Sequence, residues 1–265
     1  MTKSWFYIII ILYAYVHSGK GDDVLKRQFV DIHSHILPGV DDGCSNEEQT
    51  IAILKEMEAV GVTDVILTPH YCKRREYVAS LDFVAEVFEN LKKRAIEENI
   101  SVVLHLGTEM EYSQDGARYI REHRVNTLCG TNYILVEFPP YIKADTLLLW
   151  AREIISIGLV PVIAHIERYH HVVSNKDCVE SLKGIGALIQ VNIRSIIGYN
   201  FKIRKFMKWL ITNRYVDFIG GDVHNDFIEQ REIDKCSKFV IKHSDENYLD
   251  AVMSQNAKKY LLRQG

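Results

Sequence analysis

The sequence predicts an α/β domain with a parallel, barrel-like sheet, and three observations support this fold class. From residue 29 onward one unit recurs seven times: a short apolar run, a turn and an amphipathic helical pattern. Alternation of this kind is typical of a parallel sheet covered by helices. Polar residues directly follow most of the apolar runs, at the strand ends where the active sites of such barrels lie. A chain of 265 residues is long enough for one such domain.

The apolar runs place the strands, and the periodic segments place the helices. We expect strands at residues 29–33, 62–68, 100–106, 133–136, 160–164, 187–191 and 216–220. Helices are expected to begin near Ser45 and end at Gly61, and to cover residues 80–99, 114–123, 144–157, 175–183, 201–213 and 247–262. No linker or low-complexity tract interrupts the chain after residue 28, so residues 24–265 are predicted to form one domain.

Composition excludes several classes of function. The net charge of −3 provides no broad basic surface, which argues against a nucleic-acid partner. Five cysteines are scattered without a Cys-x-x-Cys pair, so neither a disulfide framework nor a zinc knuckle is expected.

Residues 1–23 are predicted to be a hydrophobic leader or anchor. Lys3 precedes the apolar run WFYIIIILYAYV at residues 5–16, and small residues follow, as in a secretory signal peptide. The run is shorter than the roughly 20 residues of a membrane-spanning helix. A membrane contact through residues 5–16, a misassigned start codon and an element packed on the domain are the alternatives.

The first strand carries the strongest functional signal. His33 and His35 alternate along it, so their imidazoles are expected to point to the same face. Pro38-Gly39 then turns the chain, and Asp41 and Asp42 can fold back over the strand end. Imidazole and carboxylate groups so arranged predict a metal site.

Other strands end on residues of the same chemical types. These residues are His70, Glu109, Glu137, His165, Asn192, Asp222 and His224. The alternative is that polar residues simply mark strand ends, which accounts poorly for so many histidines and glutamates. Mixed imidazole and carboxylate ligands suit Mn, Fe or Zn, and two or three such ions could bind a phosphate ester.

The motifs together resemble a known family. They are His33-Ser34-His35, Asp41-Asp42-Gly43, Thr68-Pro69-His70, Glu137-Phe138-Pro139, His165-Ile166-Glu167-Arg168 and Asp222-Val223-His224-Asn225. In this order they resemble the PHP superfamily, and within it the bacterial tyrosine-protein phosphatases encoded with capsule and exopolysaccharide genes. The resemblance covers residues 30–225 and implies a distorted seven-stranded barrel that holds three metal ions, usually Mn.

The resemblance also implies a role for each residue. The three ions would be held by His33, His35, Glu109 and Asp222, by Glu109, Glu137 and His165, and by Asp42, His70 and His224. Asp41 is the alternative to Asp42, and Glu111 is the alternative to Glu109.

Two arginines are the candidate catalytic residues. Arg168 matches the family's arginine after the fifth strand and could grip a phosphate with its planar fork. The family's second arginine has no direct match, because Glu229 stands at its position and Arg231 follows two residues later. Arg231 is therefore the candidate for this second role.

The resemblance implies a metal-dependent phosphatase that acts on phosphotyrosine in a bacterial tyrosine autokinase controlling polysaccharide synthesis. Its location would be cytoplasmic, either free or anchored to the membrane, whereas cleavage of residues 1–18 would imply export. One alternative is a related phosphatase of small phosphomonoesters such as histidinol phosphate. Amidohydrolysis is disfavoured because Glu137 stands where those enzymes often use lysine. A non-catalytic binding protein is the last alternative.

Overall fold

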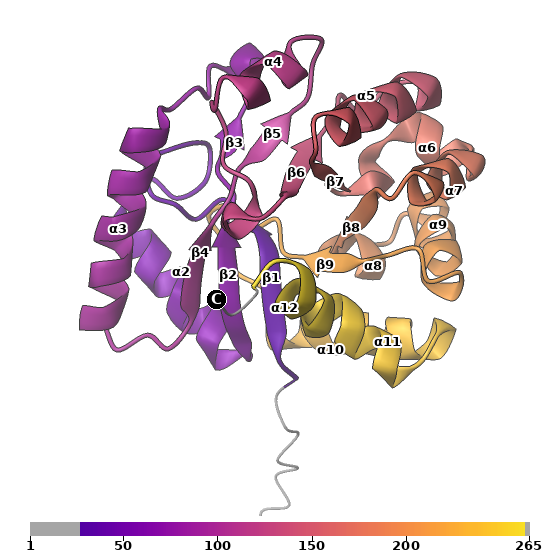
Figure 1. Cartoon of the computed structure of the whole chain (residues 1–265). Coiled ribbons are helices and arrows are strands. Elements are labelled where there is room, and N and C mark those ends of the chain that lie inside the picture. Colours follow the sequence, from indigo (N-terminus) through magenta and orange to yellow (C-terminus); the bar gives the residue numbers. More distant parts are fainter. Residues whose placement is uncertain (1–26, 263–265) are drawn as a thin grey trace, which may run out of the picture.

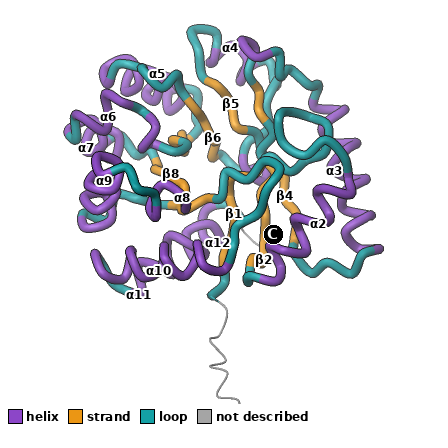
Figure 2. The backbone as a smooth tube through the Cα atoms, turned by 180° about the vertical axis from the view of Figure 1, so that it is seen from behind, coloured by secondary structure: helices purple, strands orange, loops and turns teal. Residues whose placement is uncertain are grey.

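The computed structural model describes residues 27–262, so the predicted leader or anchor at residues 1–23 lies outside the described residues. Parallel strands curl around a common centre and helices cover their outer side (Figures 1 and 2). The strands are β1 (Phe29–Ser34), β2 (Val62–Leu67), β3 (His70–Tyr71), β4 (Val103–Leu106), β5 (Glu109–Glu111), β6 (Tyr133–Glu137), β7 (Val160–Ile163), β8 (Leu188–Asn192) and β9 (Phe218–Gly220). The predicted α/β class with a parallel sheet is confirmed.

Within residues 27–262 there are nine strands in two sheets, where the sequence predicted seven strands. The sheets have the orders β1-β2-β4 and β3-β5-β6-β7-β8-β9. Strand β3 lies beyond the second predicted strand, whose residues form β2, and Thr68-Pro69 separates the two at a proline that has no N–H to donate. Strand β5 likewise lies beyond the third predicted strand, part of which forms β4, and Gly107-Thr108 separates the two. A parallel bridge between Ser34 and Val223 brings the end of β1 beside the chain that follows β9.

The helices follow the predicted segments with a few additions. They are α2 (Glu47–Ala59), α3 (Leu81–Glu97), α4 (Gly116–Arg121), α5 (Ala144–Ser156), α6 (His170–Ser174), α7 (Asp177–Gly184), α8 (Ile193–Ile197), α9 (Phe201–Thr212), α10 (Gln230–His243), α11 (Glu246–Asp250) and α12 (Asn256–Tyr260). Short helical turns are η1 (Lys73–Arg75), η2 (Leu128–Gly130), η3 (Ile166–Arg168) and η4 (Ala251–Gln255).

Helices α6, α8 and α10 were not predicted. Helix α10 is the longest of them, and it buries just Ile233, Cys236 and Val240 while charged residues fill most of its other positions. These three residues are nevertheless spaced three and four positions apart, so α10 has an apolar face that the sequence reading overlooked. The predicted start of α2 near Ser45 is confirmed, because Asn46 is the N-cap and its side chain accepts a hydrogen bond from the Gln49 N–H.

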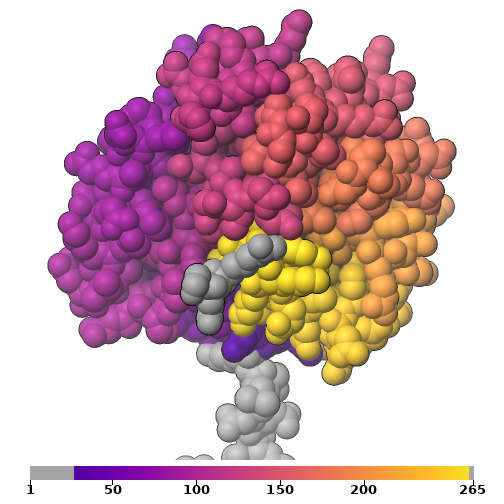
Figure 3. All heavy atoms as spheres, in the orientation of Figure 1, coloured from indigo at the N-terminus to yellow at the C-terminus, as the bar shows by residue number. Residues whose placement is uncertain are grey.

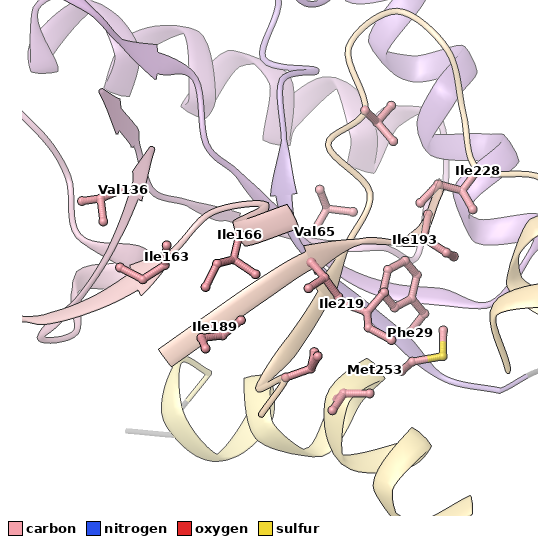
Figure 4. Packing of buried hydrophobic residues seen from close by; sticks show 14 of the residues in the cluster. Phe29, Val65, Val136, Ile163, Ile166, Ile189, Ile193, Ile219, Ile228 and Met253 are labelled. Carbon is pink, nitrogen blue, oxygen red and sulfur yellow. The ribbon is translucent and has the colours of Figure 1, made fainter. Parts of the chain in front are cut away.

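Two buried clusters hold the strands in place. The larger lies between the strands and the surrounding helices, and Figure 4 shows Phe29, Ile189 and Ile219 of three strands within it, with Met253 of η4 beside them. The smaller draws residues from strands all round the curl and therefore fills its inside; its members are Val30, Ile32, Ile66, Leu128, Leu135, Val162, Ala164, Phe218, Ala257 and Leu261.

The C-terminal segment packs against the beginning of the chain. Helix α12 contacts β1, and its Ala257 belongs to the inner cluster. In Figure 3 this segment (yellow) fills the surface between the N-terminal half of the chain and the orange segments before it. Of the helices in residues 27–262, none is both long enough and apolar enough to cross a membrane.

Candidate metal centre

Strand β1 carries a one-residue bulge at Ile32-His33. Asp31 pairs with Val65 and Ser34 pairs with Leu67, so β1 has one more residue than β2 over this stretch. A bulge of this kind changes the direction in which side chains point. The bulge lets the side chain of Ile32 stay in the inner cluster while the side chain of His33, the next residue, turns into the site.

His33 and His35 face each other across the first part of the site. Their Nε2 atoms lie 3.1 Å apart. Each Nε2 lies 3.2 Å from Oε2 of Glu109 and 3.5 Å from Oδ1 of Asp222. All four side chains are at most 4% exposed.

These separations suit ligands that share one ion. Two ligand atoms each ~2.1 Å from a metal lie ~3.0–3.4 Å apart in octahedral or tetrahedral geometry. The buried Oε2 of Glu109 has no hydrogen bond of good geometry within the described residues, although imidazole nitrogens lie around it. A divalent cation would satisfy this oxygen, so the residues present fit a metal ion.

Three histidines present Nε2 to the site because Nδ1 is engaged elsewhere. His33 Nδ1 lies 3.3 Å from Oε1 of Gln190, and His224 Nδ1 lies 3.1 Å from the carbonyl oxygen of Asp222. His35 Nδ1 lies 2.7 Å from Oδ2 of Asp41. An Nδ1–H donated to an oxygen leaves Nε2 with a free lone pair, the tautomer that a metal requires.

Glu109 links the first part of the site to a second. Its Oε1 lies 2.8 Å from Nε2 of His165, and its Oε2 lies 3.1 Å from Nδ1 of His70. Glu137 lies 3.5 Å from His70 and 3.9 Å from His165. A carboxylate with its two oxygens facing different imidazoles is placed to bridge two ions.

Asp42 organises the third part of the site. Its Oδ1 lies 3.6 Å from Nε2 of both His70 and His224. The ring of His35 lies 4.2 Å from each of these two imidazoles, which packs the third part against the first.

The structure brings all nine predicted metal ligands together, with several differences in how they group. Ligand atoms close enough to share an ion occur in four sets: His33-His35-Asp222, His33-Glu109-His165, His70-Glu109-Glu137 and His35-Asp42-His70-His224. Glu137 thus groups with His70, whereas the resemblance implied that it would group with His165. The alternative Glu111 lies outside these sets, where Arg74 Nε donates to it at 3.0 Å.

Asp41 has a different place from Asp42. Its Oδ2 also accepts the backbone N–H of His70 at 2.8 Å, and its Oδ1 accepts that of Gly43 at 3.0 Å. Burial opposes its ionisation, but the hydrogen bond and charge of His35 outweigh it and lower the pKa of Asp41. Asp41 therefore orients His35 from behind, while Asp42 faces the site.

Gln190 is a site residue that the sequence reasoning missed. Its Oε1 accepts the backbone N–H of His165 at 2.6 Å, besides facing His33, and its Nε2 donates to Oδ1 of Asn192 at 2.8 Å. Asn192 in turn donates to Oδ2 of Asp222 at 2.8 Å. The available signal was a glutamine inside the otherwise apolar strand Ala187–Val191.

Two of the candidate ligands have unusual backbone conformations. His165 has φ of 31° and Asp222 has φ of 52°, both in the left-handed region. Residues other than glycine rarely adopt it, and such strain concentrates at functional sites.

The charges of the site shift its pKa values. Burial lowers the pKa of His33, but the charges of Glu109 and Asp222 outweigh it, so this pKa is raised. Burial raises the pKa of Glu109, but the surrounding histidines hold it well below its usual range. Burial and the charge of Glu109 raise the pKa of Glu137 to about 8. Burial and the charge of His35 lower the pKa of His70 to about 3.

The two predicted catalytic arginines are placed differently. Arg168, on η3, pairs with Oδ2 of Asp222 and leaves its side chain 49% exposed. Arg231 is 72% exposed and pairs through Nε with Oε2 of Glu229 at 2.6 Å. Within residues 27–262, no hydrogen bond or ion pair joins Arg231 to the metal-ligand candidates.

The fold and the site define a parallel α/β protein with a histidine–carboxylate metal centre at its strand ends. The chain belongs to the family described as capsular polysaccharide synthesis, CpsB/CapC, whose model matches residues 29–262. This confirms the resemblance drawn from the motifs.

Several individual proteins are similar to this chain. CapC of Staphylococcus aureus is 31% identical over 201 residues, which cover 74% of this chain and 77% of CapC. The tyrosine-protein phosphatase YwqE of Bacillus subtilis is 27% identical over 244 residues, which cover 89% of this chain and 92% of YwqE.

Two solved structures are also similar to this chain. One belongs to the pair YwqE from Bacillus subtilis and CpsB from Streptococcus pneumoniae, described as unique metal-dependent tyrosine phosphatases. It matches with a TM-score of 0.79 and 25% identity, over 89% of this chain and 95% of that one. The histidinol phosphate phosphatase of Lactococcus lactis matches with a TM-score of 0.56 and 15% identity, over 82% and 94%, which is a likeness of fold.

Proposed function

We propose that this chain is a metal-dependent tyrosine-protein phosphatase whose metal ligands are the nine residues brought together at the strand ends. The observation that carries the proposal is the spacing of the ligand atoms, 3.1–3.5 Å around His33 and His35, beside a half-exposed arginine. The membership in the CpsB/CapC family and the named phosphatase activity of relatives support it.

The metal ligands, Arg168 and the residues that orient the histidines have separate roles in the proposed reaction. Divalent ions, when bound, supply a water of lowered pKa and positive charge against the phosphate oxygens. Arg168 offers N–H groups to the same oxygens from a side chain that is half in solvent. Gln190 and Asp41 hold the histidines in the required tautomer.

The proposal also covers the number and identity of the metal ions, the closure of the barrel and the second arginine. We infer three ions, with Mn as the first choice and Fe or Zn as alternatives, because mixed imidazole and carboxylate ligands suit these metals. We also infer that the strands complete a distorted seven-stranded barrel, an inference supported by the bridge from Ser34 to Val223. Arg231 stays a proposal for the second phosphate-binding arginine.

A basic groove favours a protein substrate over a small ester. Its volume is about 370 Å³, and it lies among α8, α9 and α10, with α8 starting directly after Asn192. Its lining residues are Ile196, Ile197, Tyr199, Arg204, Lys235, Lys238, Phe239 and Lys242. Within residues 27–262 none of its four cations forms an ion pair, which leaves them available to an acidic segment of a phosphoprotein. A bacterial tyrosine autokinase, met on the cytoplasmic side of the membrane, is the partner that we propose.

The test is phosphate release by the full chain from a phosphotyrosine peptide and from histidinol phosphate, with and without added Mn. We expect turnover of the peptide that requires Mn, stops with chelator and is lost in His165→Ala. The matched control is His105→Ala, since His105 pairs with Asp64 at 3.0 Å outside the metal centre. Turnover that survives both chelator and His165→Ala would refute the proposal, and preference for histidinol phosphate would move it to a small-ester phosphatase.

A further inference from the structure

Arg75 reaches into the metal centre from the turn that follows β3. Its Nη2 lies 2.5 Å from Oε1 of Glu137 and 3.1 Å from Nδ1 of His70. Its Nη1 lies 3.5 Å from Oδ2 of Asp42. One guanidinium therefore faces three of the nine metal-ligand candidates. The sequence does not predict this role for Arg75, because Arg74-Arg75 reads as a solvent-exposed basic pair.

The turn is built to hold this arginine in place. Cys72 and Tyr77 form an antiparallel bridge with N–H to carbonyl distances of 2.8 and 3.0 Å in the two directions. The Tyr77 ring lies 5.4 Å from the guanidinium carbon and is nearly parallel to the His70 ring, at an interplanar angle of 11°. Arg75 Nε also lies 3.4 Å from the sulfur of Cys72. These contacts hold the base of the guanidinium, at Nε and Cζ, and leave its two Nη groups facing the site.

Neighbouring arginines are not placed in this way. Arg74 is 70% exposed and binds Glu111, whereas the Arg75 side chain is 30% exposed. Arg231, the sequence candidate for the second phosphate-binding arginine, binds Glu229. Arg75 and Arg168 are thus the two arginines that contact metal-ligand candidates within the described residues, and they come from turns after different strands.

We propose that Arg75 supplies the second phosphate-binding guanidinium of this site and that, without metal ions, it neutralises the carboxylates that would hold them. This inference rests on the proposed function. Its Nη2 contacts Oε1 of Glu137, the oxygen that also faces His70, so a metal ion and the guanidinium would compete for this ligand atom. Its Nη1 contacts Oδ2 of Asp42, while Oδ1 faces the histidines, so at Asp42 the guanidinium offsets charge. With Glu137 holding an ion, Nη2 would be free to bind a phosphate, while Cζ and Nε of Arg75 would keep their contacts with Tyr77 and Cys72. A planar fork matches two phosphate oxygens, which an ammonium cannot do.

The two parts of the proposal predict opposite effects of one substitution. In Arg75→Ala, the Kd for Mn²⁺ measured by calorimetry on the full chain should decrease severalfold, because the competing cation is gone. The Kd of the Mn-loaded protein for inorganic phosphate should rise at least ~tenfold, the loss typical of hydrogen bonds to a charged group. Arg75→Lys keeps the charge without the fork, so it should weaken phosphate binding while its Kd for Mn²⁺ stays near that of the unaltered chain.

Arg74→Ala is the matched control and should change neither constant. Unfolding curves for all three variants check that each is folded. The proposal is overturned if Arg75→Ala leaves phosphate binding unchanged, or if it weakens Mn²⁺ binding as a merely structural residue would. Turnover of phosphotyrosine peptide by the unaltered chain reports separately on the proposed function, so the failure of one can be told from the failure of the other.

Discussion

Replacement of Asp41 by asparagine tests whether a residue that holds no metal controls the metal centre. Asp41 accepts three hydrogen bonds, from Nδ1 of His35 and from the backbone N–H groups of His70 and Gly43, at 2.7, 2.8 and 3.0 Å. Its two oxygens therefore face only donors. An asparagine has one oxygen and one NH₂ group, so Asp41→Asn places a donor against a donor whichever way the amide turns.

The size of the effect follows from these contacts. The loss of a charge-assisted hydrogen bond in a buried position costs about 1.5–3 kcal/mol in the free energy of unfolding. When His35 loses its acceptor, its Nε2 is no longer held as the unprotonated nitrogen. Loss of such an outer partner typically weakens metal affinity about 10–100-fold, which corresponds to roughly 1.4–2.7 kcal/mol.

The assay is competition for Mn²⁺ against a metal-sensitive dye, together with urea unfolding of the metal-free protein. Asp82→Asn is the matched control, because Asp82 is an exposed residue in the first turn of α3. We expect it to leave both quantities near those of the unaltered chain. If Asp41→Asn binds Mn²⁺ within a factor of about two of the unaltered protein, the assignment of Asp41 as the residue that orients His35 is wrong.

Three further predictions concern packing, protons and phosphate. Gly43→Ala would place a Cβ 1.6 Å from the carbonyl oxygen of His35, so it should destabilise the protein by more than the ~1 kcal/mol of an average substitution. Gly184→Ala, at the open end of α7, is the control and should not destabilise it in this way. Equal urea midpoints for the two variants would contradict this prediction. Because burial and the charge of Glu109 raise the pKa of Glu137 to about 8, although Arg75 opposes this rise, a fraction of this carboxyl is protonated at pH 7 and must release its proton to a metal, so Mn²⁺ affinity should rise as the pH rises toward 8. Calorimetry at pH 7 in two buffers of different ionisation enthalpy measures the released proton, and identical heats would count against it. Arg168→Lys should weaken inhibition by inorganic phosphate about tenfold or more, since an ammonium cannot replace the fork, and unchanged inhibition would remove Arg168 from the phosphate site.

The sequence alone determined the class of fold and the candidate ligands. Strand-forming apolar runs that alternate with helical segments predict a parallel sheet, and parallel strands bring their ends to one edge. That rule is local and repeats along the chain, so His33, Glu109 and Asp222 could be placed at the site without knowledge of any contact. The sequence reading missed α10, although its buried Ile233, Cys236 and Val240 recur at helical spacing among charged residues.

The tertiary structure decided which of two adjacent or chemically similar residues contacts the site and which lies behind it. Asp41 and Asp42 are indistinguishable by spacing, and their roles depend on which one meets Nδ1 of His35. Arg75 contacts Glu137 across 62 positions of sequence, and Gln190 contacts His33 across 157. Such pairings arise from the bulge in β1, from the breaks that separate β2 from β3 and β4 from β5, and from the shape of a turn. These set direction in three dimensions, which the order of residue types does not encode.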